Sequence, residues 1–140
     1  HTTNVLKLAE KISVALIGGK NITEEFRKSI VIASCLHDLG KMGQFGKPGY
    51  VPNVLASGKV SEAKPFKTNP DLLYVDHEIR SVAIAQMFID LTEEEQHAIL
   101  YHNGRYTKIG YSLVETPLQM IIHFADMWAS RVTESKEKEE

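Results

Sequence analysis

The stretch "CLHDLGK", residues 35–41, ends a run of apolar residues with a histidine and an aspartate side by side. Adjacent residues of a helix point to different faces, so this pair contributes little to a packed core. At a helix end, where the regular backbone stops, both side chains can point the same way. His37 and Asp38 therefore indicate a functional position at the end of a helix.

The composition is that of one globular domain. The chain has 140 residues, of which 43% are hydrophobic and 24% are charged, and no apolar run approaches the ~20 residues of a membrane span. A net charge of -2 argues against general binding to nucleic-acid backbones. The single cysteine, Cys35, excludes an internal disulfide, fits a reducing cytoplasm and is expected to be buried in its apolar run. We therefore expect a cytoplasmic protein that binds neither membranes nor nucleic acids generally.

The chain begins at His1, with no methionine before it and no signal peptide. Two explanations stay open at this point. Either residues of the domain are missing upstream, or His1 is the remnant of a purification tag.

Helical periodicity and capping residues predict five helices, at about residues 5–16, 24–38, 77–88, 93–101 and 117–132. Thr23, Asp76, Thr92 and Thr116 are the expected N-caps. The segment of about residues 39–75 is rich in glycine and proline and is expected to be a long loop that covers a site, with a short strand or helix in "YVPNVLASG". Residues 105–115 read as a second loop. The pattern predicts one all-α domain of five or six helices over residues 1–132, followed by a solvated charged tail over residues 133–140.

Histidines and aspartates gather at the predicted helix ends. Four of the six histidines fall there, two at starts and two at finishes: His1, His77, His37 and His102. Asp126 lies inside the last helix, one turn after His123 and on the same face. Imidazole and carboxylate together are the ligand set of divalent Mn, Fe, Co, Ni and Zn. The sequence therefore predicts a metal site where the helix ends meet.

"CLHDLGK" resembles the motif that names the HD-domain superfamily of metal-dependent phosphohydrolases. The order H…HD…H…H…D covers nearly the whole chain, through "HTTNVLKLAEKI", "DHEIRS", "LYHNG" and "HFADMWAS". The resemblance implies a compact HD-domain helical bundle over residues 1–132 and, because His77 and His102 match two additional histidines of the pattern between the HD pair and the last aspartate, a binuclear site. By this resemblance His1, His37 and Asp126 bind one ion, His77 and His102 bind the other, and Asp38 bridges both. The chain lacks the GYP motif of the cyclic-dinucleotide phosphodiesterases in this branch.

Several further residues are candidates for contact with the substrate. Lys41 in "HDLGK" resembles family lysines that meet the substrate phosphate, and Arg80 and Arg105 are phosphate ligands or surface charges. His123 is a neighbour of the ligands, a substrate contact or a core histidine, whereas His97 is expected at the surface. A further set of aromatic side chains is available to stack on a base: Phe45, Tyr50 and Tyr106.

The expected function is hydrolysis of a phosphate ester or anhydride of a small substrate, with a nucleotide favoured. A hydroxide activated by two divalent ions would attack phosphorus, and Asp38 and Lys41 would be the catalytic residues. Two alternatives stay open. One is a mixed-valent diiron oxygenase of the HD type, and the other is a non-catalytic HD module that binds a nucleotide or a partner protein.

Overall fold

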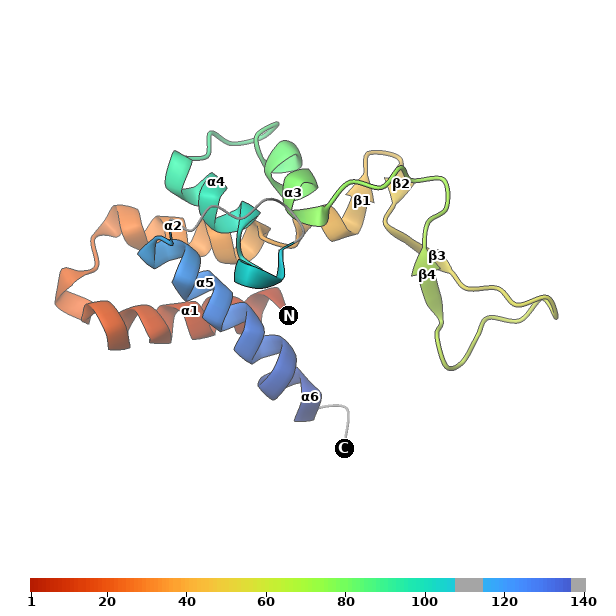
Figure 1. Ribbon diagram of the computed structural model, residues 1–140, viewed down its shortest axis with the longest axis horizontal. Coiled ribbons are helices and arrows are strands. Elements are labelled where there is room, and N and C mark those ends of the chain that lie inside the picture. The colour runs from red at the N-terminus through yellow and green to blue at the C-terminus, as the bar shows by residue number, and fades with distance from the viewer. Residues whose placement is uncertain (108–114, 137–140) are drawn as a thin grey trace.

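The computed structural model describes residues 1–107 and 115–136, which are mostly helical (Figure 1). The α-helices are α1 (Thr2–Ile17), α2 (Glu24–Leu36), α3 (His77–Ala85), α4 (Glu93–Leu100), α5 (Pro117–Trp128) and α6 (Glu134–Lys136). The shorter turns are the 3₁₀ turns η1 (Gly19–Asn21), η2 (Leu39–Met42) and η3 (Gly104–Tyr106) and the π turn η4 (Ala129–Thr133). Among the described residues, none of the helices combines the length and the apolar content that a membrane crossing requires.

Side-chain caps fix three of the helix starts where the sequence predicted them. The hydroxyl of Thr23 accepts the backbone N–H of Phe26 at 3.1 Å, and Thr92 forms a reciprocal capping box with Glu95. Thr116 caps α5 in the same way and is followed by a proline at the first helical position. Asp76 stands before α3 but does not cap it. Its carboxylate accepts the hydroxyl of Tyr74 instead.

The core lies between α1, α2, α4 and α5, with one side chain from α3 and one from the loop before α4. α1 packs against α2 and α5, and α4 packs against α5, α2 and α3. The buried apolar side chains are Val5, Ala9, Ile30, Ala33, Ala85, Leu91, Ala98, Ile99, Leu118, Ile121, Ile122, Ala125 and Ala129. Two histidines, His37 and His102, are also buried almost completely. The core therefore ends against polar groups at the point where the helix ends meet.

The structure differs from the sequence prediction at the end of α3, at Phe88 and at Cys35. α3 ends at Ala85 rather than near residue 88, because the N–H groups of Met87 and Phe88 bond three residues back and tighten the last turn. Phe88 is exposed and lies beside Phe45, with ring centroids 6.1 Å apart. Cys35 is exposed, so its predicted burial is wrong: it lies two residues after the buried Ala33, about 200° further around α2.

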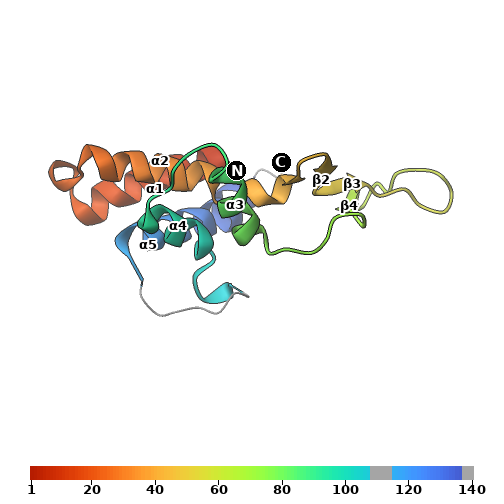
Figure 2. The same cartoon turned by 90° about the horizontal axis from the view of Figure 1, so that it is seen from above.

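Residues 43–75, which we call the arm, extend away from the helices in both views (Figures 1 and 2). The arm holds two short antiparallel ladders, β1 (Gly43–Gln44) with β2 (Lys47–Pro48) and β3 (Tyr50–Pro52) with β4 (Phe66–Thr68). The segment is therefore a long connection without α-helices, as predicted, and β3 is the short strand at the start of "YVPNVLASG". Asn69 is buried at the base of the arm, and its side-chain amide donates to the carbonyl of Pro48 at 2.9 Å, which joins the two sides of the arm.

The turn after the His37-Asp38 pair packs directly on α3. The backbone N–H of Gly40 donates to the Ser81 hydroxyl at 2.8 Å, and that hydroxyl donates to the carbonyl of His37 at 2.9 Å. A Cβ atom at Gly40 would overlap the carbonyl oxygen of His77 and would lie 2.8 Å from the backbone nitrogen of Ser81. The glycine of "HDLGK" therefore allows η2 to approach the first turn of α3, which brings Asp38 close to His77.

Gly40→Ala is expected to lower the free energy of unfolding by about 1–3 kcal/mol, because the added methyl group forces η2 and α3 apart. Gly19→Ala is the matched control, since its Cβ would meet only a Val14 methyl group at 3.9 Å, and it should change stability by less than about 0.5 kcal/mol. Urea titration of both variants measures the difference. Equal stability of the two variants would contradict the packing described for Gly40.

Candidate metal centre

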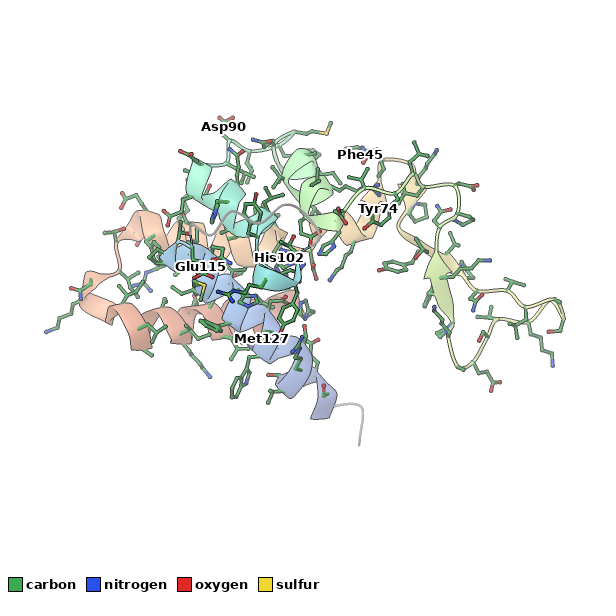
Figure 3. All side chains as sticks on the ribbon, viewed as in Figure 1. Phe45, Tyr74, Asp90, His102, Glu115 and Met127 are labelled. Atoms are coloured by element: carbon green, nitrogen blue, oxygen red, sulfur yellow. The ribbon has the colours of Figure 1, made fainter. Side chains whose placement is uncertain are left out.

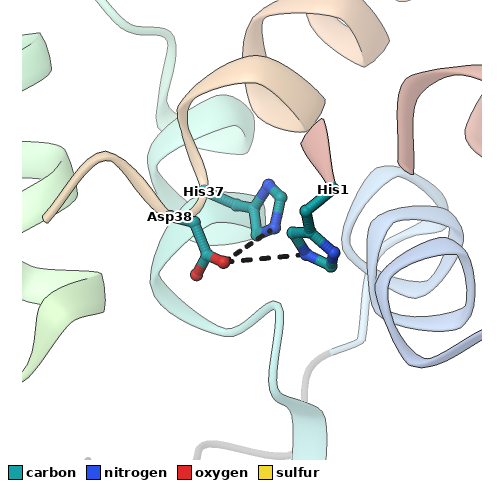
Figure 4. Close-up of side chains that lie close together, drawn as sticks. All are labelled: His1, His37 and Asp38. Carbon is teal, nitrogen blue, oxygen red and sulfur yellow. Dashed lines mark ion pairs between the residues drawn. The ribbon is translucent and has the colours of Figure 1, made fainter. Parts of the chain in front are cut away.

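The six predicted ligands come from five helices or their ends and converge on one place. His1 is the N-cap of α1, His77 is the first residue of α3, and Asp126 lies in α5. His37 is the C-cap of α2, with Asp38 directly after it. The remaining ligand, His102, follows the end of α4 and lies at the centre of the helical part in Figure 3. Figure 4 shows three members of this cluster together: His1, His37 and Asp38.

Asp38 lies in the middle, with its two oxygens facing different histidines. Its Oδ1 is 3.2 Å from His77 Nε2 and 3.6 Å from His102 Nε2. Its Oδ2 is 3.6 Å from His37 Nε2 and 3.7 Å from His1 Nε2. One carboxylate therefore separates the histidines into two pairs.

Asp126 lies closest to His1 and His37, although its carboxylate is also within metal-binding distance of His37 and His102 together. Its Oδ1 is 3.0 Å from His1 Nε2 and 3.9 Å from His37 Nε2. We call His1, His37 and Asp126 the His1 half, and His77 with His102 the His77 half, with Asp38 between them. His/Asp groups within metal-binding distance are thus present on both sides of Asp38.

The buried histidine of each half is oriented by a backbone carbonyl. His37 Nδ1 is 2.8 Å from the carbonyl oxygen of Ser34, and His102 Nδ1 is 2.7 Å from that of Ile99. A carbonyl oxygen only accepts hydrogen bonds, so Nδ1 must carry the proton in both rings. Each neutral ring therefore turns the Nε2 lone pair toward Asp38, as a metal-ligating histidine does.

The more exposed histidine of each half is oriented by a carboxylate. His1 Nδ1 lies 2.9 and 3.1 Å from the two oxygens of Glu134, and His77 Nδ1 lies 3.2 Å from Glu78 Oε2. Glu78 is buried and also accepts the side-chain amide of Asn103 at 2.6 Å. Neither glutamate was predicted as part of the site, and Glu134 was assigned to the solvated tail, which is wrong for this residue. Its carboxylate is a partner of His1.

The Nε2 atoms of the histidines and the oxygens of Asp38 face one another, and most of them can only accept a hydrogen bond. His77 Nε2 and His102 Nε2 are 3.4 Å apart, and the Nδ1 atom of each ring faces an acceptor that takes the single proton of a neutral imidazole. Among the described residues, His37 Nε2 and Asp38 Oδ1 are buried and have no hydrogen-bond partner. Buried acceptors that face one another without a donor are costly. Divalent cations between them would satisfy these atoms, so the donor set fits the metals that the sequence predicts.

Two titratable groups in the centre are held in the protonation state that metal binding needs. Burial acts to raise the pKa of Asp38, but the neighbouring imidazoles of His77 and His37 and the Lys41 ammonium outweigh it and hold that pKa well below its ordinary value. Burial, together with the neighbouring His37, lowers the pKa of His102 to about 4. Asp38 is therefore an anion and His102 is a neutral donor at pH 7.

Acid is expected to destabilise the metal-free protein in two steps. Between pH 6.5 and about 4 the unfolded chain protonates His102 but the folded chain does not, so the free energy of unfolding falls with pH, on the order of 2–3 kcal/mol. The contribution of the Asp38 anion is present above its unfolded pKa of 3.8 and is lost as the pH falls below that value. Urea titrations in chelator from pH 7.5 to 4.5 test the first step. His102→Asn should flatten the profile, and an equally steep profile in that variant would contradict the assignment.

No protein-family model, no curated protein and no solved structure matches this chain. The H…HD…H…H…D order in the sequence and the cluster in the structure consist of the same six residues, with Asp38 in the middle.

A cleft of about 400 Å³ opens beside the His77 half, between the base of the arm and α3. Its polar and aromatic lining includes Lys41, Tyr50, Tyr74, His77, Arg80 and Tyr106. Lys41 is half-exposed, and its ammonium lies 2.7 Å from Asp38 Oδ2. In Figure 3, Tyr74 lies at the base of the arm. The cleft therefore borders His77 directly and lies beside Asp38 through Lys41.

The predicted substrate contacts divide into those at the cleft and those away from it. Arg80 is buried rather than at the surface, and it donates to the carbonyl of Leu73 at 2.8 Å, which holds the cleft wall in place. Arg105 is exposed and lines a different hollow of about 310 Å³. His123 lines that same hollow, and its Nδ1 is 2.7 Å from the carbonyl oxygen of His102, so it supports the backbone of the His77 half.

The remaining aromatic and histidine candidates also differ in whether they line the cleft. Tyr50 and Tyr106 line the cleft, whereas Phe45 does not and lies against Phe88. His97 is half-buried beside Tyr101, with ring centroids 5.0 Å apart, and takes no part in the cluster. Residues 108–114 of the second predicted loop lie outside the described residues.

Proposed function

We propose that this protein is a metal-dependent phosphohydrolase of the HD-domain type. It holds two divalent ions and hydrolyses a phosphate ester or anhydride of a small substrate, with nucleotides as the favoured class. The observation that carries the proposal is the position of Asp38, whose two oxygens face two separate pairs of imidazoles. A bridging carboxylate between two histidine groups is the arrangement that two neighbouring ions need.

The charge of the centre suits divalent cations. Four carboxylates contact the histidines, one negative charge each: Asp38, Asp126, Glu78 and Glu134. The Lys41 ammonium beside Asp38 reduces their sum of -4 to -3, so one divalent ion would leave -1 and two would leave +1. Imidazole and carboxylate without thiolate favour Mn, Fe, Co, Ni or Zn.

When bound, a pair of ions supplies Lewis acidity and makes a water acidic enough to attack phosphorus at neutral pH. The residues of the chain provide the rest. Asp38 lies between the two halves, and the Nδ1 contacts of His37 and His102 hold their rings with Nε2 toward Asp38, where the ions would bind. Lys41 places a positive charge at the cleft next to Asp38, where it can stabilise the oxygens of a phosphate. Tyr50 and Tyr106 give the cleft aromatic faces for the rest of the substrate.

The test is a panel of nucleoside mono-, di- and triphosphates, cyclic nucleotides and cyclic dinucleotides, assayed with each candidate metal in turn. Phosphate or nucleotide release that requires added metal and stops in chelator is the expected result. Consumption of dioxygen with iron and no phosphate release would instead indicate a diiron oxygenase. Binding of a nucleotide without turnover under every metal would indicate a non-catalytic module.

Lys41→Ala is expected to lower kcat/KM by about 100-fold while two ions stay bound, because its ammonium is at the cleft and is not a metal ligand. Lys47→Ala is the matched control. Lys47 lies six residues further along, is exposed and donates only to the carbonyl of Asp71. Turnover and metal content are measured on the same preparations. Unchanged turnover of Lys41→Ala would remove this residue from the site.

A further inference from the structure

Glu134 makes contacts that a residue of a solvated tail would not make. Its two carboxylate oxygens lie 2.9 and 3.1 Å from His1 Nδ1, and Oε1 also accepts the side-chain amide of Asn4 at 3.3 Å. Asn4 lies one turn further along α1 than His1. Glu134 therefore joins the C-terminal helical segment to the first turn of α1 at the metal centre.

The π turn η4 explains how Glu134 reaches this place. Asp126 and Glu134 are eight residues apart, which in an uninterrupted α-helix is a rotation of ~800°, about 80° away from the same face. The hydrogen bonds of a π turn span one residue more, so each residue of Ala129–Thr133 rotates less. Over the five residues of the turn this difference returns Glu134 to the face of Asp126. One helical segment thus presents two carboxylates to one histidine.

The two carboxylates hold opposite sides of the His1 ring. Asp126 Oδ1 is 3.0 Å from Nε2, and Glu134 is on Nδ1. The side chain of His1 is 27% exposed, whereas that of His37 is fully buried, so packing alone holds the His1 ring less firmly. Both carboxylates accept hydrogen bonds, so they compete for the single proton of a neutral ring. Glu134 faces Nδ1 with both of its oxygens and Asp126 faces Nε2 with one, which favours the Nδ1–H form and leaves Nε2 as the ligand atom.

We propose that Glu134 is the positioning residue of the His1 half. It selects the Nδ1–H tautomer of His1 and fixes the ring so that Nε2 faces the ion of that half. The part of this inference that concerns the ion rests on the proposed function; the tautomer part concerns the protein alone. Glu78 has the corresponding contact with His77 in the other half, which provides an internal comparison.

The first measurement tests the tautomer without metal. Nitrogen NMR of the imidazole rings in the chelator-treated protein at a pH where His1 is neutral should show His1 with the proton on Nδ1. In Glu134→Ala the ring should shift toward the Nε2–H form, while His37, which is held by the carbonyl of Ser34, should not change. An unchanged His1 tautomer in Glu134→Ala would overturn the proposal whether or not the protein binds metal.

The second measurement is a titration of the whole chain with Zn²⁺ and with Mn²⁺ by calorimetry. Glu134→Gln should weaken one of the two binding events by about 10–100-fold, the usual effect of losing a hydrogen-bond partner of a metal ligand. Glu78→Gln should weaken the other event, and Ser135→Ala, next to Glu134 on the exposed side, should weaken neither. Equal weakening of both events by Glu134→Gln, or no weakening, would contradict its assignment to the His1 half.

The two experiments separate the two proposals. If wild-type protein binds neither metal but the His1 tautomer still depends on Glu134, the metal-dependent function fails and the positioning contact stands. If both ions bind and Glu134→Gln leaves both affinities unchanged, the function stands and the role of Glu134 fails. Unfolding of Glu134→Gln in chelator provides the folding control, and its stability should stay within about 0.5 kcal/mol of the wild type.

Discussion

Asp38→Asn is expected to abolish tight binding of both metal ions and to reduce turnover to background. The substitution keeps the size and shape of the side chain but removes the negative charge that both halves share. Its oxygens lie 3.2–3.7 Å from the Nε2 atoms of all four histidines of the centre, so Asp38 contacts both halves. Loss of a hydrogen-bond partner behind a ligand costs about 10–100-fold in affinity, and loss of a shared ligand should cost more at each half.

Metal content by mass spectrometry after dialysis, together with kcat, measures this prediction. Asp90→Asn is the matched control, because Asp90 is exposed in the loop between α3 and α4, far from the cluster in Figure 3. Circular dichroism of both variants checks the fold. Retention of both ions by Asp38→Asn would contradict the bridging position, and loss of only one ion would place Asp38 in a single half.

Metal is also expected to stabilise the fold strongly. A ligand at 100 times its Kd adds about 2.7 kcal/mol to the free energy of unfolding, so two ions add roughly twice that, or about 10–20 °C in Tm for a chain of this size. Ions held by the six clustered residues would connect five separate segments, from the N-cap of α1 to the last turn of α5. Their removal therefore frees contacts between helices far apart in sequence.

Thermal unfolding with and without Zn²⁺ or Mn²⁺, followed by chelator, measures this shift. His37→Ala should lose much of it, since its ring is a fully buried member of the His1 half. His97→Ala should keep it, because its ring lies against Tyr101 outside the cluster. A Tm that is the same with metal and with chelator would contradict a structural contribution of the centre.

The helices and the six clustered residues were predictable because their signals are local. Capping threonines and apolar periodicity mark the helix boundaries, and the structure confirms three of those caps directly. The histidines at helix ends could be expected to meet, since in a small bundle the ends lie close together. The burial of Arg80 and the exposure of Cys35 were not predictable in the same way. They depend on which face of a helix the rest of the fold covers.

The two glutamates that contact the Nδ1 atoms of His1 and His77 could not be found from their spacing in the sequence. Glu134 stands eight residues after Asp126, a spacing that places the two side chains on different faces of a regular helix, and only the π turn brings them together. Glu78 is adjacent to His77, and adjacent residues of a helix do not normally share a face. It reaches His77 Nδ1 because both residues lie in the first turn of α3.

The arrangement of two metal sites around Asp38 is tested most directly by counting ions per chain. Inductively coupled plasma mass spectrometry, with native mass spectrometry of the same samples, should find two ions in the wild type and one in each of His1→Ala and His77→Ala. Each variant removes a ligand from one half and leaves the other half complete. One ion or none in the wild type, or an undiminished count in His77→Ala, would contradict the paired centre.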